Sequence, residues 1–473
     1  MAKADDIGSA KNPLEMTINK RFFVSMLTRD IELEDAILDL LDNCLDGAVR
    51  TSKPSGKTKK PYHGFWAKIT INQNRFEIFD NCGGIPQNLI RTAFAIGRNP
   101  AADEHHKTIG VYGIGMKRAI FKMALEATVE SNSSFGFEVD IDEKWLTQDH
   151  NWRLAFRRVQ TPFKSGTKIS IPSLRPEIKK VFGSTSFVTR LQEFISRHYA
   201  VIISKGFRVE LNGVAVPAAP VAILSAASNT ILKAEDGQPV LAPYMLKYET
   251  PKVSASIWVG MYRRPLATEG EEESETEQRQ SSDNSGWTII CNDRAIVSND
   301  TTILTGWGDA GVPRFHPQFI GIRGIVVMES EYPLELPLTT TKRGLDASSE
   351  LFLQLKGYMR EGTKTFTNFT NHWKTERGKA RELFDEATLM ELPKLKQLLE
   401  TLPFTSVKNL PGAKRFQPNL PTPAPSEMKR ISFLRHQAQV ARVGRRVLED
   451  AHAKPSDVGA ACFDYFLKKG TDQ

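Results

Sequence analysis

Hydrophobic and polar positions recur along residues 36–48 with the period of an α-helix. The apolar positions fall on one face and are Ile37, Leu38, Leu41, Leu45 and Ala48. Asp39, Asn43 and Asp46 stand at i, i+4 and i+7, so an α-helix projects all three from the opposite face. The pattern predicts an amphipathic helix packed on a core. Its polar stripe has the geometry of a magnesium and nucleotide site, although a stripe alone is more often solvated surface.

A β-hairpin is predicted next, because residues 66–72 and 75–79 read as two strands separated by a turn at 72–74. The second strand runs into Asp80-Asn-Cys-Gly-Gly-Ile85, which places a carboxylate beside a backbone that glycine allows to approach closely. Pro86 then suits the first turn of a helix. The candidate site residues here are Asp80, Gly84 and Ile85.

Two glycine-containing segments follow. Gly110-Val-Tyr-Gly-Ile-Gly-Met-Lys117 leads into an apolar helix, whose free backbone N–H groups would hold phosphate oxygens. Ser165-Gly-Thr-Lys-Ile-Ser-Ile171 places Thr167 at the start of a β-branched strand. The candidate residues of the first segment are Gly110, Tyr112, Gly113, Ile114, Gly115, Met116 and Lys117.

These four blocks, in this order, resemble the GHKL ATPases, the superfamily of DNA gyrase, the large dimeric heat-shock chaperones, histidine kinases, MutL and the MORC proteins. The layout is most similar to MutL- and MORC-type bacterial ATPases. Each block by itself is a weak signal, whereas the ordered set is specific. The resemblance implies an N-terminal α/β domain of the Bergerat sandwich type, with ATP and magnesium as cofactors.

The resemblance also implies roles for single residues. Magnesium prefers hard oxygen ligands, so the amide oxygen of Asn43 with phosphates and waters makes an adequate site. Ionised Asp80 would accept the adenine amino group, and Asp39 would orient and deprotonate the attacking water. Most relatives carry Glu where this chain has Asp39, which makes slow turnover or a binding-only switch an open alternative. Cys82 also replaces the first glycine of the D-x-G-x-G pattern.

Residues 1–215 are expected to form this ATP-binding α/β domain, with helices over one face of a mixed, largely antiparallel sheet. Residues 216–370 are expected to form a second, transducer-like α/β domain. Residues 371–473 read as a helical C-terminal region with a proline-rich break at 410–425. The polar stretch 98–108 is where the family's ATP lid would fall, and its adjacent His105 and His106 lack a third ligand for zinc.

The stretch Leu336-Pro-Leu-Thr-Thr-Thr-Lys-Arg-Gly344 lies late in the second domain. Relatives send a lysine from a comparable loop to the γ-phosphate, and Lys342 matches it best. Arg343 is the alternative residue. The other interpretation is that both side chains are simply exposed cations.

Composition narrows the class of protein without fixing it. The chain has 473 residues, 40% of them hydrophobic, and a formal charge of +8 from 63 basic and 55 acidic residues. This small excess permits nucleic acid as a partner but does not indicate it. The four cysteines lack C-x-x-C spacing, and no apolar run approaches the roughly 18 residues that span a bilayer. We therefore expect reduced thiols and a cytoplasmic location.

The expected function is magnesium-dependent ATP binding and hydrolysis. ATP binding is expected to close a homodimer on DNA or on partner proteins, including products of the same operon. Bacterial genome or phage defence is one biological process that such a protein would serve. The alternatives are a non-hydrolysing ATP-gated interaction module and a chaperone-like clamp. A histidine kinase is disfavoured because no histidine precedes Asp39. The arginine-containing residues 431–468 suit a nucleic-acid contact, a dimer-forming cap or a solvated helix face.

Overall fold

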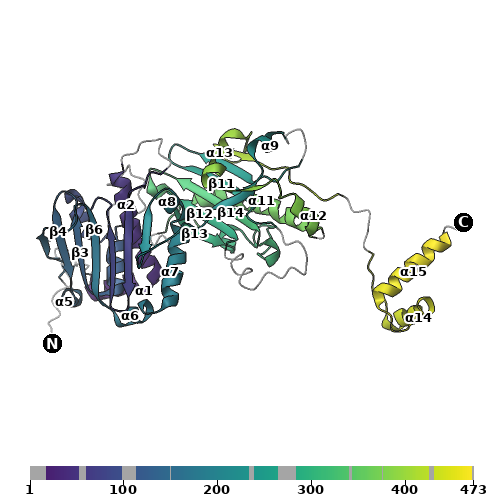
Figure 1. The fold of residues 1–473 in the computed structure, drawn as a ribbon, viewed down its shortest axis with the longest axis horizontal. Helices are drawn as coiled ribbons and strands as arrows, with labels where there is room; N and C mark the ends of the chain where they lie inside the picture. Colours follow the sequence, from purple (N-terminus) through teal and green to yellow (C-terminus); the bar gives the residue numbers. More distant parts are fainter. Residues whose placement is uncertain are drawn as a thin grey trace, which may run out of the picture. The chain divides into compact units, whose positions relative to one another are not determined.

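The computed structural model describes residues 18–52, 60–97, 113–149, 151–233, 239–264, 284–339, 344–374, 376–424 and 431–470 (Figure 1). The chain divides into two compact units, Met1–Thr422 and Pro423–Gln473. Among the described residues, the first unit contains two large sheets and one two-stranded sheet, and the second contains two helices.

The first sheet has eight strands in the order β5-β4-β3-β6-β2-β1-β7-β8. All neighbouring strands in it are antiparallel except β1 and β7, which are parallel. The expectation of a mixed, largely antiparallel sheet is therefore confirmed. The strands are β1 (Trp66–Asn72), β2 (Arg75–Asp80), β3 (Ala124–Asn132), β4 (Gly136–Ile141), β5 (Phe156–Arg158), β6 (Gly166–Leu174), β7 (Arg208–Leu211) and β8 (Val214–Ala215).

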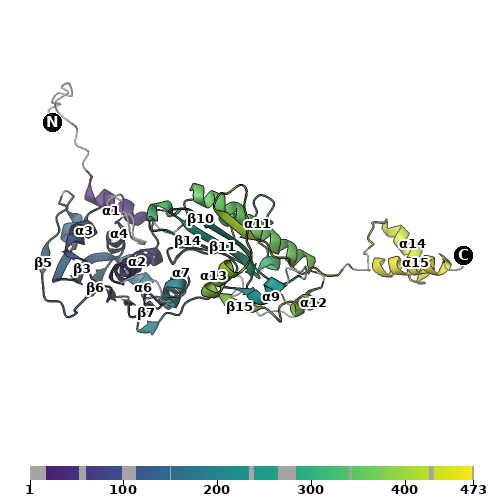
Figure 2. The ribbon, with the colours of Figure 1, turned by 90° about the horizontal axis from the view of Figure 1, so that it is seen from above.

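One face of this sheet packs on helices. Along β1, Ala67, Ile69 and Ile71 are buried while the residues between them are not, as expected for a strand with one covered face. Helices α2 and α4 lie side by side on the covered face (Figure 2). The helices of this domain are α1 (Lys20–Arg29), α2 (Leu33–Thr51), η1 (Gln87–Leu89), α3 (Ile90–Phe94), α4 (Gly115–Met123), α5 (Glu143–Thr147), α6 (Pro176–Phe182), α7 (Thr185–His198) and α8 (Ala200–Ser204).

The second sheet has seven strands in the order β13-β12-β14-β11-β10-β17-β16. Helix α11 (Glu350–His372) packs against β10, β11 and β14. Trp287 and Trp307, expected in the core, are 1% and 3% exposed. The strands are β10 (Tyr244–Glu249), β11 (Ser254–Met261), β12 (Gly286–Cys291), β13 (Arg294–Asp300), β14 (Ile322–Glu329), β16 (Thr405–Ser406) and β17 (Ala413–Phe416).

Smaller elements lie beside the second sheet, and the part of the compact unit Met1–Thr422 from β9 to β17 is called the second domain below. Strands β9 (Ala222–Ser225) and β15 (Thr388–Glu391) form a separate antiparallel pair, against which α13 (Leu392–Thr401) packs. The remaining short helices are α9 (Ser228–Lys233), η4 (Ile303–Thr305), η5 (Pro317–Phe319), η6 (Pro333–Glu335) and α12 (Arg377–Glu382).

The region after residue 370 differs from the expected run of helices. It holds β15, β16 and β17, and β17 joins the second sheet by pairing Ala413–Phe416 with residues of β10. This strand fits between Pro411 and Pro418, so the prolines that interrupt helical periodicity bound it instead. A helical C-terminal region is present as α14 (Gln437–Val447) and α15 (Pro455–Gly470).

All four cysteines are within the described residues and are free thiols. Among the helices that the structure describes, none is long and apolar enough to cross a membrane.

A close contact in the second sheet gives a test of this packing. A Cβ added to Gly324 in β14 would lie 2.3 Å from carbon atoms of the Trp287 ring. We expect Gly324→Ala to lower the free energy of unfolding by about 1–3 kcal/mol, because the buried ring has no space to move into. Urea denaturation of the full chain measures this.

The matched control is Gly357→Ala on the exposed side of α11, where an added Cβ would meet no atom within 4 Å. Alanine there should raise the free energy of unfolding by about 0.5–1 kcal/mol. Equal effects of the two variants would contradict the packing of Trp287 on Gly324.

Candidate functional site

A cavity of about 430 Å³ lies where α2, α4 and the adjoining ends of β2 and β6 meet. The candidate site residues among its lining are Asp39, Asn43, Asp46, Asp80, Gly84, Ile85, Gly113, Ile114, Gly115, Met116, Lys117 and Thr167. The structure thus brings together, around one space, residues from all four sequence blocks.

Helix α2 presents the predicted polar stripe to this cavity. Asp39 is buried, Asn43 is exposed and Asp46 is half-buried. Arg50 continues the stripe one turn further, and its Nη2 donates a hydrogen bond to the Gly84 carbonyl at 2.7 Å. The stripe therefore also fastens α2 to the turn after β2.

Asp39 forms an ion pair with the guanidinium of Arg118. Both side chains are nearly inaccessible, at 4% and 6% exposure for Asp39 and Arg118 respectively. A Cβ on Gly115 would lie 3.1 Å from the Asp39 carboxyl carbon, so the start of α4 also packs directly on this carboxylate. The predicted general base is thus already engaged by a buried cation.

Asp80 ends β2 at the buried side of the cavity and is 5% exposed. Its Oδ1 accepts hydrogen bonds from the backbone N–H groups of Cys82 at 2.7 Å and Thr167 at 3.3 Å. Burial raises the pKa of the Asp80 carboxyl to about 6, and hydrogen bonds from the Cys82 amide and the Cys44 thiol oppose part of that rise. At neutral pH the carboxyl is mostly ionised.

The turn after Asp80 depends on two glycines. Gly83 and Gly84 have φ of +89° and +67°, a region that residues with a Cβ rarely adopt. A Cβ on Gly84 would also lie 2.1 Å from the Asn132 carbonyl oxygen. The turn thus forms with Cys82 in the place of the pattern's first glycine. Ile85 leaves it with its N–H donated to Ser131 Oγ at 2.9 Å.

The Gly166–Thr167 step closes the same side of the cavity. Gly166 has φ of +133°, and an added Cβ would lie 1.9 Å from the Asp80 carbonyl oxygen. Thr167 follows, with its hydroxyl 3.0 Å from Ser131 Oγ. Glycine is therefore needed for the Thr167 amide to reach the Asp80 carboxylate.

Helix α4 starts at the cavity. Gly113 has φ of +66°, and Ile114 at the N-cap provides no side-chain cap for the N–H groups of the first turn, which includes Gly115 and Met116. Lys117 is buried and its Nζ donates to the Ala93 carbonyl at 2.7 Å. Burial lowers the pKa of the Lys117 ammonium to about 8. This lysine thus links α4 to the end of α3.

Several predicted features lie outside the described residues. They are Gly110, Tyr112, Lys342, Arg343, the expected lid and the pair His105 and His106.

Two charged residues of the cavity lining were not predicted from the sequence, Arg50 and Arg118. Arg50 continues the spacing of Asp39, Asn43 and Asp46 on one helix face, so the helical period could have identified it. Arg118 had no such signal, because its pairing with Asp39 depends on how α2 and α4 pack.

Among the described residues, no group of three or more histidine, cysteine or acidic side chains could hold a metal. Magnesium that accompanies a nucleotide usually keeps phosphate oxygens and waters among its ligands. Asn43 is exposed at the cavity and suits a single protein ligand of this kind.

Comparison with known proteins identifies part of the chain. Residues 31–154 match a family model described as "Histidine kinase-, DNA gyrase B-, and HSP90-like ATPase". The curated proteins contain no match for the chain. The particular likeness to MutL and MORC thus stays a prediction. The family match and the mixed sheet support the same conclusion: residues 31–154 are similar to a GHKL-type ATPase domain, a type that binds ATP, typically with magnesium.

Proposed function

We propose that this protein binds Mg–ATP in the cavity between α2 and α4 and hydrolyses it slowly. The observation that carries the proposal is the convergence of the four sequence blocks on one cavity with the Asp80 carboxylate at its buried side.

Asp80 is the proposed determinant of base choice. A buried, ionised carboxylate accepts the exocyclic amine of adenine, whereas guanine presents a carbonyl at that position and leaves the charge unpaired. Ile78 and Ile169 also line the cavity and offer apolar contact to a base. Adenine is therefore the favoured nucleobase.

We place the phosphates of the nucleotide at the start of α4, beside Asn43. The uncapped N–H groups at the start of α4 suit an anion, and Asn43 offers an amide oxygen to the magnesium ion that accompanies it. Magnesium, when bound, supplies charge neutralisation on the phosphates. Lys342 remains the proposed contribution of the second domain on sequence grounds alone.

Hydrolysis requires a base at Asp39. The carboxylate would take the proton of the attacking water, but Arg118 holds it in an ion pair. A side chain one methylene shorter than the glutamate of most relatives must also reach that water. These two features favour slow turnover, and they make a non-hydrolysing, ATP-gated module the second candidate.

The first prediction concerns the pH dependence of nucleotide affinity. Because the Asp80 pKa is about 6 and the ionised form accepts the adenine amine, affinity should fall as pH is lowered through 6, approaching tenfold for each unit below it. Calorimetric titration with a non-hydrolysable ATP analogue between pH 5 and 8 measures it, with excess magnesium to keep the phosphates ionised.

Asp80→Asn is the companion variant and should remove most of the affinity at pH 7.5. Flat affinity across this range, or near-native binding by the variant, would reject Asp80 as the adenine acceptor.

A second prediction separates hydrolysis from binding. Asp39→Asn should keep ATP affinity within a few-fold of the wild type and lower phosphate release by about 10²-fold or more, because the base is lost while Asn43 and Asp80 are kept. Thermal melting checks the fold of this variant, because Arg118 loses its buried partner. The control on the same helix is Glu34→Gln, which removes a surface ion pair with Arg190 outside the cavity. Phosphate release by Asp39→Asn at the wild-type rate would place the base elsewhere, and no release by the wild type would favour the binding-only module.

We also propose that ATP closes a homodimer. The supporting observation is an apolar stripe at the N-terminal helix, where Ile18, Phe22 and Met26 are 58%, 68% and 49% exposed. Phe22 and Met26 are one turn apart on α1 and Ile18 directly precedes its N-cap, so a second copy would cover the N-terminal part of this helix. DNA, or proteins from the same operon, are the proposed substrates of the closed state.

Light scattering with and without the ATP analogue tests closure, in the presence and absence of duplex DNA. We expect a larger mass with nucleotide for the wild type and for Leu353→Asp, an exposed position on α11, but not for Phe22→Asp. One unchanged mass and shape in all states would reject dimer closure.

A further inference from the structure

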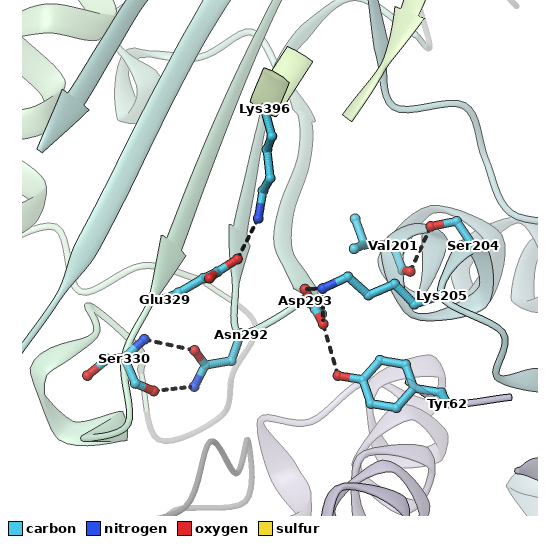
Figure 3. A network of polar contacts seen from close by, with 9 residues as sticks. All are labelled: Tyr62, Val201, Ser204, Lys205, Asn292, Asp293, Glu329, Ser330 and Lys396. Atoms are coloured by element: carbon cyan, nitrogen blue, oxygen red, sulfur yellow. Dashed lines mark hydrogen bonds and ion pairs between the residues drawn. The ribbon is translucent and has the colours of Figure 1, made fainter. Parts of the chain in front are cut away.

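The turn between β12 and β13 reaches from the second domain into the ATP-binding domain. Asn292 and Asp293 form this turn, with φ of +44° and +69°. The Asn292 side chain fixes it, since its Nδ2 donates to the Ser330 carbonyl and its Oδ1 accepts the Ser330 N–H, both at 3.0 Å (Figure 3). The turn is therefore anchored rigidly to its own sheet.

Asp293 contacts two elements of the first domain. Its carboxylate accepts hydrogen bonds from the Tyr62 hydroxyl at 2.9 Å and from Lys205 Nζ at 2.6 Å (Figure 3). Tyr62 precedes β1 and Lys205 follows α8. This one carboxylate thus joins the second sheet to the two segments that lead into β1 and β7.

Arg294 makes the deeper contact, with α2. Its Nε donates to Asp42 Oδ1 at 3.0 Å, and the Tyr199 hydroxyl donates to the same oxygen at 2.5 Å. The two charged side chains are 4% and 1% exposed, and the guanidinium lies 5.0 Å from the centre of the Tyr199 ring. Burial lowers the pKa of Arg294, but the charge and hydrogen bond of Asp42, together with the nearby Tyr199 and Asp35, outweigh burial and keep the pKa above its ordinary value. The pair is a buried, charged connection between the domains.

His198 adds a neutral contact beside this pair. Burial, followed by the nearby Arg294 charge, lowers the pKa of His198 to about 3, so the ring is uncharged at neutral pH. Its Nδ1 lies 2.6 Å from the Ala295 carbonyl oxygen, to which a neutral ring donates. The β13 strand is consequently fixed to α7 as well as to α2.

Asp42 is on the helix that carries the cavity residues. It immediately precedes Asn43, while Asp39 and Asp46 are each within about one turn of it. A shift of α2 along or about its axis would have to move Arg294 or break a buried ion pair, which is costly. The cavity face and the domain contact are therefore parts of one rigid element.

We propose that Arg294 is a positioning residue that couples nucleotide occupancy of the α2 cavity to the β12–β13 hairpin of the second domain. This inference rests on the proposed ATP binding. The link is separate from Lys342, because it acts through α2 and not through the phosphates. Coupling between two sites is reciprocal. If bound nucleotide stabilises the contacts of the hairpin with α2 by some factor, then breaking these contacts must weaken nucleotide binding by the same factor.

The experiment is hydrogen exchange of the full chain, with and without a non-hydrolysable ATP analogue and magnesium, together with analogue affinity by calorimetry. In the wild type, nucleotide should slow exchange in residues 286–300 as well as in α2. The test variant combines Asp42→Asn with Arg294→Gln, so that no buried charge is left unpaired. It should bind the analogue with an affinity changed by about fivefold or more and lose the nucleotide response of residues 286–300.

Lys396→Gln is the matched control, because Lys396 pairs with Glu329 at 2.7 Å inside the second domain near the same turn (Figure 3). It should keep both the affinity and the exchange response. Thermal melting checks the fold of each variant. If the double variant does not fold, Arg294→Lys takes its place, since it keeps the charge but not the planar guanidinium, and should also lose the response.

The outcomes are distinct. If the double variant binds the analogue with wild-type affinity and keeps the wild-type change in hydrogen exchange, the coupling is overturned while the proposed function stands. The coupling is also overturned if the wild type binds the analogue but hydrogen exchange in residues 286–300 does not change. A wild type that fails to bind the analogue overturns the proposed function and the coupling together.

Discussion

The buried carboxylates of α2 constrain the whole first unit. A helix that carries Asp39 and Asp42 into the interior of a fold needs a cation for each, because an unpaired buried charge is strongly destabilising. Arg118 on α4 pairs with the first, and Arg294 on β13 with the second. One pair assembles the cavity, and the other joins the second domain to it. Charge neutralisation on a single helix thus accounts for both the site and the domain contact.

Close backbone approach is the second constraint, and it shapes the buried side of the cavity. Gly84 and Gly166 both hold conformations with positive φ, and at both positions a Cβ would overlap a carbonyl oxygen of a neighbouring strand or turn. Their absence of side chains lets the ends of β2, β3 and β6 converge on Asp80. The raised pKa of Asp80 follows from the same convergence, because the strands exclude water from the carboxylate.

Local periodicity was sufficient to predict α2, the β1–β2 hairpin and the side of α2 that faces the cavity. It was insufficient wherever a contact joins distant segments. Arg294 and Asp42 are far apart in sequence, and nothing near either residue indicates its partner. Strand β17 is only four residues long and acquires its structure by pairing with β10, so the prolines around it read as a break in helices. Tertiary packing decided these cases, and single-sequence patterns do not contain it.

The two ion pairs of α2 differ in whether a nucleotide in the cavity could compete for one of the partners. Arg294 and Asp42 lie away from the cavity, where solvent and ligand do not compete for either group, so the pair suits a fixed connection. Arg118 and Asp39 both line the cavity, where the phosphates of a nucleotide would offer the guanidinium an alternative anion. Exchange of that partner would free Asp39 to act as a base only when nucleotide is present. In the function proposed above, with the phosphates at the start of α4, Arg118 would therefore make the availability of Asp39 as a base depend on bound nucleotide.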